Sequence, residues 1–325
     1  MHLYISNFSL TQFRKAEPFE IKYRLRLSMK QFLWIAGFIL LVLAGDRLGG
    51  YLLRQVIEGS EFRYSRLYTG RAEADLLLLG NSRGLAFYQP YIEEKTQLAT
   101  LNLSYNGLPI NLAAGLVRDY YDHYPAPEKI VIDVSLCDRF DDQLIMNFSP
   151  YLPYSQRIDS LIRLADPQIR GGLGLSHLFR YNSEIFQRAL YYQNRSDEGW
   201  VVERNLSEKE SRSVAEDYEF IIYYPEEAPE ILADLVRYCQ QQGSEVQLVL
   251  GPYFPAFLAK MSNLETYIST IEQATGLPVH NFSNTVDDFH LFADFQHLNK
   301  AGSKVFIDSL FQMGVLSSRT EQALE

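Results

Sequence analysis

The sequence predicts a three-layer α/β sandwich with a central parallel sheet of about five strands and one transmembrane helix before it. Two observations predict the sandwich. Five short runs are apolar on both faces, as expected for parallel strands that helices cover on both sides. Segments with helical spacing lie between these runs, and such alternation is typical of right-handed crossover connections. The apolar runs are 74–80, 98–103, 129–135, 245–250 and 278–282, and the helical segments are 110–123, 228–242, 261–275 and 299–313.

An apolar segment near the N-terminus predicts the transmembrane helix. Residues Phe32–Gly45 hold no charge, and apolar residues resume at Leu48 and continue to Leu53. Counted from Phe32 to Leu53, the segment has 22 residues, close to the roughly 20 that a bilayer requires. The Asp46-Arg47 pair inside it can lie at the headgroup level, where a charge costs less. A cleaved signal peptide and a buried core helix are the two alternatives.

Basic residues before this segment set its expected orientation. Arg24, Arg26 and Lys30 precede the helix, so the positive-inside rule leaves the N-terminus in the cytoplasm. The rest of a single-pass protein is then expected on the extracytoplasmic (periplasmic) side of the cytoplasmic membrane. Met29-Lys30 has the position of a translation start, which makes residues 1–28 a cytoplasmic tail or a misassigned start.

The rest of the sequence is predicted to form one domain with an insertion. Residues 29–53 are the expected anchor, and the polar, Arg-rich segment 54–72 is interpreted as a juxtamembrane linker. The α/β domain is expected over 73–316. Its alternation of strands and helices fails between about 138 and 216, where a helical or irregular insertion is expected to wall the site. Residues 317–325 are interpreted as a C-terminal tail.

Charge and cysteine content exclude several functional classes. The formal net charge is −10, and the first 30 residues carry six basic against two acidic side chains, so the remainder is strongly acidic. Binding to nucleic acid needs a concentrated basic surface, and no nucleic-acid partner is expected. Cys137 and Cys239 are too few for a disulfide framework and lack metal-ligand spacing, so we interpret them as buried thiols. No cofactor and no metal site is predicted.

A candidate nucleophile follows the first predicted strand. The segment Gly80-Asn81-Ser82-Arg83-Gly84 lies between this strand and a predicted helix. A serine at this position lies at the carboxyl edge of the sheet, where backbone amides at a helix N-terminus stabilise an anion. Serine is also a favoured N-cap residue and glycines mark turns, so the segment by itself more often indicates a structural turn.

A candidate base and its carboxylate lie just before the last predicted helix, in the segment 294–299 (DFQHLN). A hydroxyl becomes nucleophilic when a base removes its proton, and imidazole titrates in the useful range. A carboxylate three residues before the histidine can reach the other ring nitrogen and hold its tautomer. The two segments together predict a catalytic triad of Ser82, His297 and Asp294, although capping and surface roles are common for each segment alone.

A second cluster nearby contains Asp287, Asp288 and His290. We disfavour it as the source of the base, because its spacing is shorter and the apolar pair Leu291-Phe292 follows it. A zinc site is the other functional interpretation of this acidic stretch. It lacks a third clear ligand at suitable spacing.

The pattern resembles one hydrolase family better than another. Residues 80–84 match the Gly-x-Ser-x-Gly elbow of α/β-hydrolases, but that elbow follows several strands and its acid and base come from separate loops. Here Ser82 follows the first strand, and Asp294 and His297 share one loop. The chain resembles the SGNH (GDSL-like) superfamily over about residues 73–316. It is similar to the membrane-tethered subset, which includes envelope acyl-transfer proteins.

The resemblance implies a flavodoxin-like sandwich and an oxyanion hole. It assigns the hole to the backbone amides of Ser82 and Gly107, where Gly107 ends the segment after the second strand. The third block of the family departs from the pattern, because Cys137 stands where an oxyanion asparagine is expected. A thiol is a weak donor, and loss of one such donor costs about 10²- to 10³-fold in rate. Asn81 and Asn106 are the candidate replacements.

Two further residues complete the predicted substrate-binding set of Asn81, Arg83, Asn106 and Tyr253. Arg83 is expected either to bind an anionic part of the substrate or to pair with an acid on the surface. Tyr253 is expected either to stack on a sugar or to pack in the core or rim of the domain.

These expectations together predict a serine esterase or O-acyltransferase at the outer face of the membrane. The resemblance implies acyl esters of cell-envelope glycans or small esters as substrates, and polysaccharide-modification proteins as partners. The alternative is a glycan-binding or assembly component without strong catalysis, which Cys137 favours. A nucleotide-binding, flavodoxin-like domain is disfavoured because no Gly-rich phosphate loop follows the first strand.

Overall fold

The computed structural model describes residues 28–213 and 219–319. The expected N-terminal tail therefore lies outside the described residues except for Ser28, as do positions 214–216 of the expected insertion and 320–325 of the expected C-terminal tail. The chain divides into two units, Met1–Gly45 and Asp46–Glu325. The helix α1 (Met29–Gly59) begins in the first unit and ends in the second.

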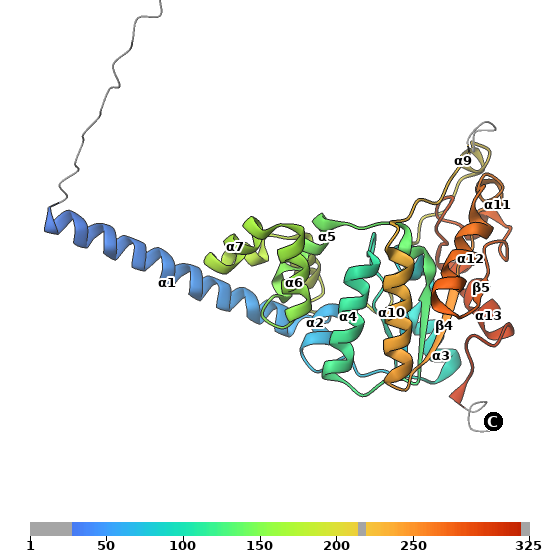
Figure 1. The fold of residues 1–325 in the computed structure, drawn as a ribbon, viewed down its shortest axis with the longest axis horizontal. Helices are drawn as coiled ribbons and strands as arrows, with labels where there is room; N and C mark the ends of the chain where they lie inside the picture. The colour runs from blue at the N-terminus through green and yellow to red at the C-terminus, as the bar shows by residue number, and fades with distance from the viewer. Residues whose placement is uncertain (1–27, 214–218, 320–325) are drawn as a thin grey trace, which may run out of the picture. The chain divides into compact units, whose positions relative to one another are not determined.

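A parallel sheet of five strands forms the centre of the second unit, in the order β2-β1-β3-β4-β5 (Figure 1). The strands are β1 (Leu76–Leu79), β2 (Thr100–Asn102), β3 (Lys129–Asp133), β4 (Glu245–Leu250) and β5 (Val279–Asn281). Each lies within one of the five predicted apolar runs, and every residue of β1 is buried. The predicted α/β class is confirmed.

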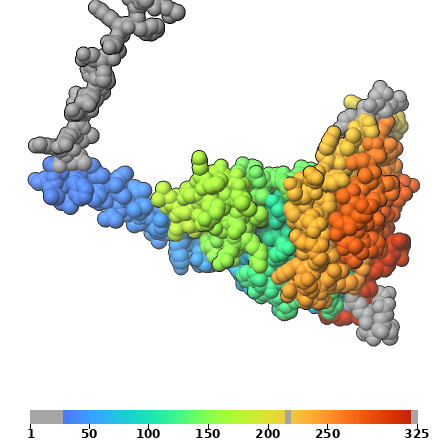
Figure 2. All heavy atoms as spheres, in the orientation of Figure 1, coloured from blue at the N-terminus to red at the C-terminus, as the bar shows by residue number. Residues whose placement is uncertain are grey.

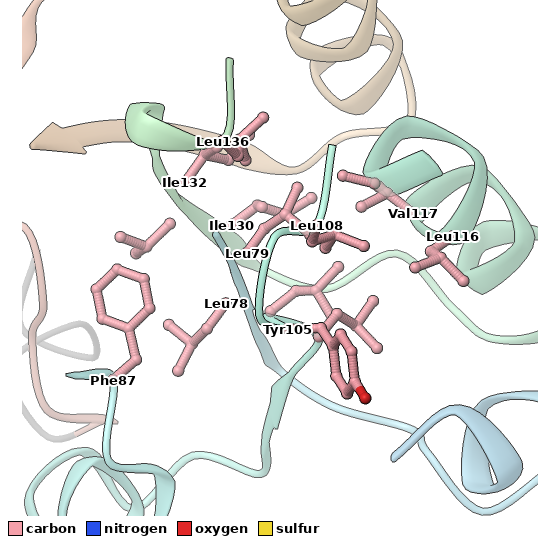
Figure 3. Packing of buried hydrophobic residues seen from close by; sticks show 14 of the residues in the cluster. Leu78, Leu79, Phe87, Tyr105, Leu108, Leu116, Val117, Ile130, Ile132 and Leu136 are labelled. Carbon is pink, nitrogen blue, oxygen red and sulfur yellow. The ribbon is translucent and has the colours of Figure 1, made fainter. Parts of the chain in front are cut away.

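Helices cover both faces of this sheet. On one face α4, α10 and α12 lie side by side. On the other face α13 lies near α3, and Lys95 of α3 pairs with Asp308 of α13. Figure 3 shows the two sides of the core, with Phe87 on one side of β1 and Leu116 and Val117 of α4 on the other. The helices are α3 (Gln89–Thr96), α4 (Ile110–His123), α10 (Ala228–Gln241), α12 (Leu264–Thr275) and α13 (Lys300–Gln312).

Short helices occupy the chain between β3 and α10, where the sequence predicts an insertion. Each of the five α-helices begins at a residue whose side chain accepts a backbone N–H, as is typical of N-caps; these N-cap residues are Asp141, Ser155, Asp166, Ser183 and Ser207. In Figure 2 the yellow-green atoms of this segment form one block of the surface beside α4. The helices are α5 (Asp142–Asn147), α6 (Gln156–Ala165), α7 (Pro167–Leu175), α8 (Glu184–Tyr191) and α9 (Glu208–Ser211), with 3₁₀ turns η3 (Ser149–Tyr151) and η4 (Leu178–Tyr181).

The helix α1 is long and apolar enough to cross a membrane, and no other helix of the described chain is. It has 31 residues, and none of its most apolar window is buried, which contradicts the alternative of a buried core helix. A signal sequence meets the same criteria of length and composition, so that alternative stays open.

The interpretation of residues 54–72 as a linker is wrong. The helix α1 continues to Gly59, and α2 (Arg63–Tyr68) follows it with Tyr64 and Leu67 fully buried. The arginines of this segment led to the expectation that it is exposed to solvent. Arg63 is instead buried, in an ion pair with Asp197 at 2.8 Å. Because a buried charge is tolerated when it is paired and hydrogen-bonded, an Arg-rich segment can belong to the core.

Replacing Arg63 with Met should lower the free energy of unfolding by about 3–5 kcal/mol, because Asp197 would stay buried with only the more distant Arg66, at 3.9 Å, as a cationic neighbour. Urea unfolding of the full-length protein in detergent measures this change. The control Arg237→Met removes an exposed arginine that pairs with Glu230 and Asp234 on α10, and we expect a loss below about 1 kcal/mol. Equal losses in the two variants would contradict the assignment.

Candidate active site

The segment after β1 has no room for side chains at its two glycines. A Cβ atom on Gly80 would lie 2.7 Å from the Cα of Gly84, and one on Gly84 would lie 2.4 Å from Ser104 Oγ. Ordinary van der Waals contacts are longer by about 1 Å. Glycine is therefore required at both positions, and the tight packing sets Ser82 at the start of η1 (Arg83–Ala86), at the carboxyl edge of the sheet.

The predicted serine, histidine and aspartate lie in one hydrogen-bonded row. His297 Nε2 is 2.8 Å from Ser82 Oγ, and His297 Nδ1 is 2.8 and 2.9 Å from the two carboxylate oxygens of Asp294. A carboxylate only accepts, so Nδ1 donates to Asp294 and Nε2 of the neutral ring accepts from the Ser82 hydroxyl. This is the geometry that removal of the serine proton by a base requires.

The carboxylate of Asp294 also organises its own turn. Its Oδ1 accepts the backbone N–H of Gln296 at 2.9 Å and that of His297 at 3.0 Å. Burial raises the pKa of Asp294, but the bonds from the His297 ring and these amides outweigh burial, so the pKa falls below its ordinary value. The stabilisation by this charged carboxylate is therefore present at neutral pH and is lost as the pH falls through the depressed pKa.

The last residue of the histidine segment begins the next helix. Asn299 is the N-cap of α13, and its side-chain oxygen accepts the N–H of Gly302 at 3.0 Å. The same amide group donates to Asn205 Oδ1 at 2.9 Å and to the carbonyl oxygen of His290 at 2.7 Å. An asparagine just before a predicted helix was the available signal for this role, which the motif alone did not reveal.

The expected oxyanion amides are free within the described part of the chain. The N–H groups of Ser82 and Gly107 form no hydrogen bond with another described residue. The loop after β2 is tied to the nucleophile segment, because Tyr105 N donates to the carbonyl oxygen of Gly80 at 3.3 Å. Asn106 in this loop is exposed, and no described residue binds its side-chain amide. These donors are available to a substrate.

Asn81, which was expected to bind substrate or to replace the oxyanion asparagine, is buried, and both atoms of its side-chain amide form hydrogen bonds within the protein. Its Nδ2 donates to the carbonyl oxygen of Ser135 at 2.8 Å and lies 3.5 Å from Asp138 Oδ2. Its Oδ1 accepts from the backbone N–H of Arg83 at 2.9 Å and from Ser135 Oγ at 3.0 Å. The side chain of Asn81 therefore joins the nucleophile segment to η2 (Val134–Asp138) and is not available for substrate or oxyanion.

Arg83 is also buried, and its guanidinium binds backbone carbonyl oxygens rather than an acid on the surface. One terminal nitrogen donates to the carbonyl oxygen of Gln296 at 2.7 Å. The other donates to the carbonyl oxygens of Gly251 and Pro252, at 2.5 and 3.1 Å. Arg83 therefore connects the serine segment to the loop after β4 and to the turn that carries His297.

The ring of Tyr253 lies under this guanidinium. The Arg83 Cζ atom is 3.5 Å from the ring centroid, and the Tyr253 side chain is only 4% exposed. Stacking of this ring on a sugar is therefore excluded, and the expectation of core or rim packing is correct. Burial raises the pKa of Tyr253, which keeps the phenol neutral. Its hydroxyl forms no hydrogen bond with any residue in the described ranges.

The thiol of Cys137 faces away from the serine. Cys137 is fully buried, and its Sγ lies 4.0 Å from the carbonyl oxygen of Ala228 in α10. Burial also raises the pKa of this thiol. Cys137 and Cys239 are both free and buried, as predicted. Cys137 therefore supplies no donor to the site.

The second acidic cluster lies apart from the triad. Asp288 accepts the backbone N–H of His290 at 2.9 Å and caps η5 (Phe289–Leu291), and the His290 ring packs on Phe289. Asp287 and His290 are exposed. Among the described residues no three His, Cys, Asp or Glu side chains are arranged to hold a metal ion.

A cavity begins beside the triad. Its volume is about 460 Å³, within the range of small-molecule sites. Neighbours of both Ser82 and His297 line it, because Arg83 and Gln296 belong to its wall. The ring of Tyr253 and the polar side chain of Asp138 also contribute. This cavity was not predicted, because segments far apart in the sequence form it.

A second, much smaller hollow lies directly at the serine. Ser82, His297 and Val202 line it together, and its volume is about 10 Å³, which holds about one water molecule. Val202 belongs to an extended segment, residues 197–206, that we name the cover segment. The sequence did not predict that Val202 lies beside Ser82, because an irregular segment carries no pattern that indicates its neighbours in the fold.

Comparisons with known proteins find likenesses among solved structures alone. No protein-family model and no curated protein matches the chain. One solved structure that resembles it is a "putative acylhydrolase" from Bacteroides fragilis, which is 10% identical. The likeness covers 75% of this chain and 86% of that chain, with a TM-score of 0.37. A TM-score this low does not establish a shared fold, so the proposals below depend on the geometry of this chain.

Replacing Arg83 with Met should lower the free energy of unfolding by about 2–4 kcal/mol, because the buried carbonyl oxygens of Gly251 and Gln296 would lose their donor. Chemical unfolding measures the loss. The matched control is Arg139→Met, since Arg139 is exposed and pairs with the adjacent Asp138, and we expect a change within about 1 kcal/mol. A loss for Arg83→Met as small as the control's would refute the connecting role.

Proposed function

We propose that this chain is a membrane-anchored serine esterase or O-acyltransferase of the SGNH type, with its α/β domain on the extracytoplasmic side. The observation that carries the proposal is the row of hydrogen bonds from Ser82 through His297 to Asp294. A serine in contact with a histidine that a carboxylate orients is the arrangement of an activated nucleophile. The long apolar helix α1 supports the anchor.

The first half of the reaction transfers the acyl group to the protein. Ser82 Oγ attacks the ester carbonyl carbon while His297 Nε2 takes the hydroxyl proton. The carbonyl oxygen becomes an oxyanion, which the amides of Ser82 and Gly107 stabilise, and Asn106 supplies the third donor in place of the buried Cys137. The ester C–O bond then breaks, and His297 returns the proton to the leaving alcohol.

The second half regenerates the serine. A water molecule or a glycan hydroxyl attacks the acyl carbon, and His297 takes its proton. The bond between the acyl carbon and Ser82 Oγ breaks, and Oγ receives the proton from His297. Asp294 stays charged throughout, in keeping with its lowered pKa, and stabilises the imidazolium that forms in each half.

The two hollows support a substrate with a small acyl group and a larger polar partner. The space at Ser82 holds about one water molecule, which favours an acetyl group. The cavity of about 460 Å³ has the unpartnered Tyr253 hydroxyl and Asp138 in its wall, and such groups bind sugar hydroxyls. Acyl esters of envelope glycans are therefore the substrate class we propose, with polysaccharide-modification proteins as partners.

Labelling with a fluorophosphonate probe tests the nucleophile. Wild-type protein should become covalently labelled, and Ser82→Ala and His297→Ala should lose labelling because one removes the attacking oxygen and the other its base. The matched controls are Ser160→Ala and His290→Ala, which change an exposed serine and an exposed histidine and should label like the wild type. If folded wild-type protein is not labelled, the proposed enzymatic activity is refuted and the alternative of a glycan-binding component is favoured.

Enlarging the hollow at the serine should change the acyl preference. Val202→Ala removes part of the wall beside Ser82, so kcat/KM for a butanoyl ester should rise by about 10-fold relative to that for an acetyl ester. Hydrolysis of the two p-nitrophenyl esters measures this ratio. Val305→Ala on the exposed side of α13 is the control. An unchanged ratio in Val202→Ala would show that the acyl group lies elsewhere.

A further inference from the structure

We propose that the turn joining α7 to η4 is a second membrane contact, which rests its apolar side chains on the lipid surface beside α1. We name Leu175, Leu178 and Phe179 the lipid-facing patch. These side chains are 71%, 43% and 42% exposed. The proposal rests on the proposed transmembrane role of α1, and it goes beyond the catalytic site.

The length of the apolar run places residues beyond Gly45 at membrane level. The uncharged stretch Phe32–Gly45 has 14 residues, which as a helix span about 21 Å. The hydrocarbon core of a bilayer is about 30 Å thick. The span therefore has to include the next two turns of α1, whose Leu48, Tyr51 and Leu52 are exposed and mostly apolar.

One side of those same turns is bound to the α7–η4 turn. The carboxylate of Asp46 accepts from Ser176 Oγ at 2.5 Å and from the backbone N–H groups of His177 and Leu178, at 2.8 and 3.1 Å. Arg47 donates to the carbonyl oxygen of Leu175 at 3.1 Å. The α7–η4 turn is thus held at the level where the apolar run of α1 continues.

Close packing strengthens this attachment. A Cβ atom on Gly49 would lie 2.8 Å from Leu178 Cδ2, and one on Gly50 would lie 2.5 Å from His177 Cβ. Contacts this close leave no layer of solvent or lipid between the helix and the turn. The turn and this part of α1 therefore belong to one packed body, and both lie at the depth that the span of α1 sets.

The chemistry of the turn suits a lipid surface. Residues 171–179 (GGLGLSHLF) contain no acidic residue, lysine or arginine. The charge of Asp46 is matched by Arg47 and by three donors, which lowers the cost of placing this pair inside the outer end of the span. Exposed leucine and phenylalanine in such a position bury apolar area in the headgroup and acyl boundary. A lipid surface is therefore the occupant that these contacts favour.

Site-directed fluorescence measures the depth of the patch. Native Cys137 and Cys239 are fully buried, so a cysteine introduced at an exposed position is the reactive one in the folded protein. Leu175→Cys and, separately, Phe179→Cys would be labelled with the polarity-sensitive dye NBD. The full-length variants would be reconstituted into vesicles of phosphatidylethanolamine and phosphatidylglycerol, with and without lipids brominated on the acyl chain.

Two further cysteine variants distinguish the proposed lipid contact of the α7–η4 turn from the transmembrane role of α1. Leu41→Cys reports on α1 in the span, and Met313→Cys reports on an exposed position near the end of α13. We expect blue-shifted emission and loss of emission with brominated lipid at Leu41, Leu175 and Phe179, and neither change at Met313. Unlabelled wild type confirms that the native thiols stay unreactive.

The other outcomes refute either the lipid contact of the patch or the transmembrane anchor itself. If Leu41 is quenched while Leu175 and Phe179 behave like Met313, α1 spans the bilayer and the patch does not contact lipid, which refutes this proposal and points to a protein occupant. If none of the positions is quenched, the transmembrane anchor fails and the second contact fails with it. Labelling at Ser82 by a fluorophosphonate probe is independent of both results.

Discussion

One guanidinium joins three loops at the carboxyl edge of the sheet. Arg83 follows the nucleophile and donates to carbonyl oxygens after β4 and in the turn that carries His297. Arg83 thereby ties together the segments that carry Ser82 and His297, whose side chains lie 2.8 Å apart although 215 positions separate them in the chain. Backbone carbonyl oxygens bind both terminal nitrogens of the guanidinium and the face of Tyr253 lies against it, while its buried Nε atom has no hydrogen-bond partner among the described residues.

A second buried arginine connects the region after α1 to the same edge. Arg63 pairs with Asp197 and donates to the carbonyl oxygens of Asn102 and Ser104, at 3.0 and 2.9 Å. Those carbonyls lie in the loop that carries Gly107, and Asp197 begins the cover segment. The stretch that the sequence presents as a linker therefore holds both the proposed oxyanion loop and the segment over the serine, since a buried ion pair tolerates little displacement.

The proposed site combines a hydrogen-bonded row of serine, histidine and aspartate with an altered set of candidate oxyanion donors. Cys137 is directed into the core against α10, and Asn81 is used to fix the serine segment. The remaining free donors are the amides of Ser82 and Gly107 and the exposed side chain of Asn106. In the proposed reaction, a developing oxyanion would be stabilised mainly by backbone amides, which need little reorganisation during the reaction.

The sequence by itself determined the sheet, because each strand is a local apolar run that only burial on both faces explains, and the model confirms the α/β class. It also predicted Ser82, Asp294 and His297 as candidates, because their spacing relative to predicted strands and helices is a local property, and the structure brings these three side chains into one hydrogen-bonded row. Only the tertiary structure decided what Arg83 binds, that segment 54–72 is core, and which stretch covers the serine. Those outcomes depend on partners far along the chain, and the burial of a charged side chain follows from the acceptors that the fold brings to it, which no local pattern encodes.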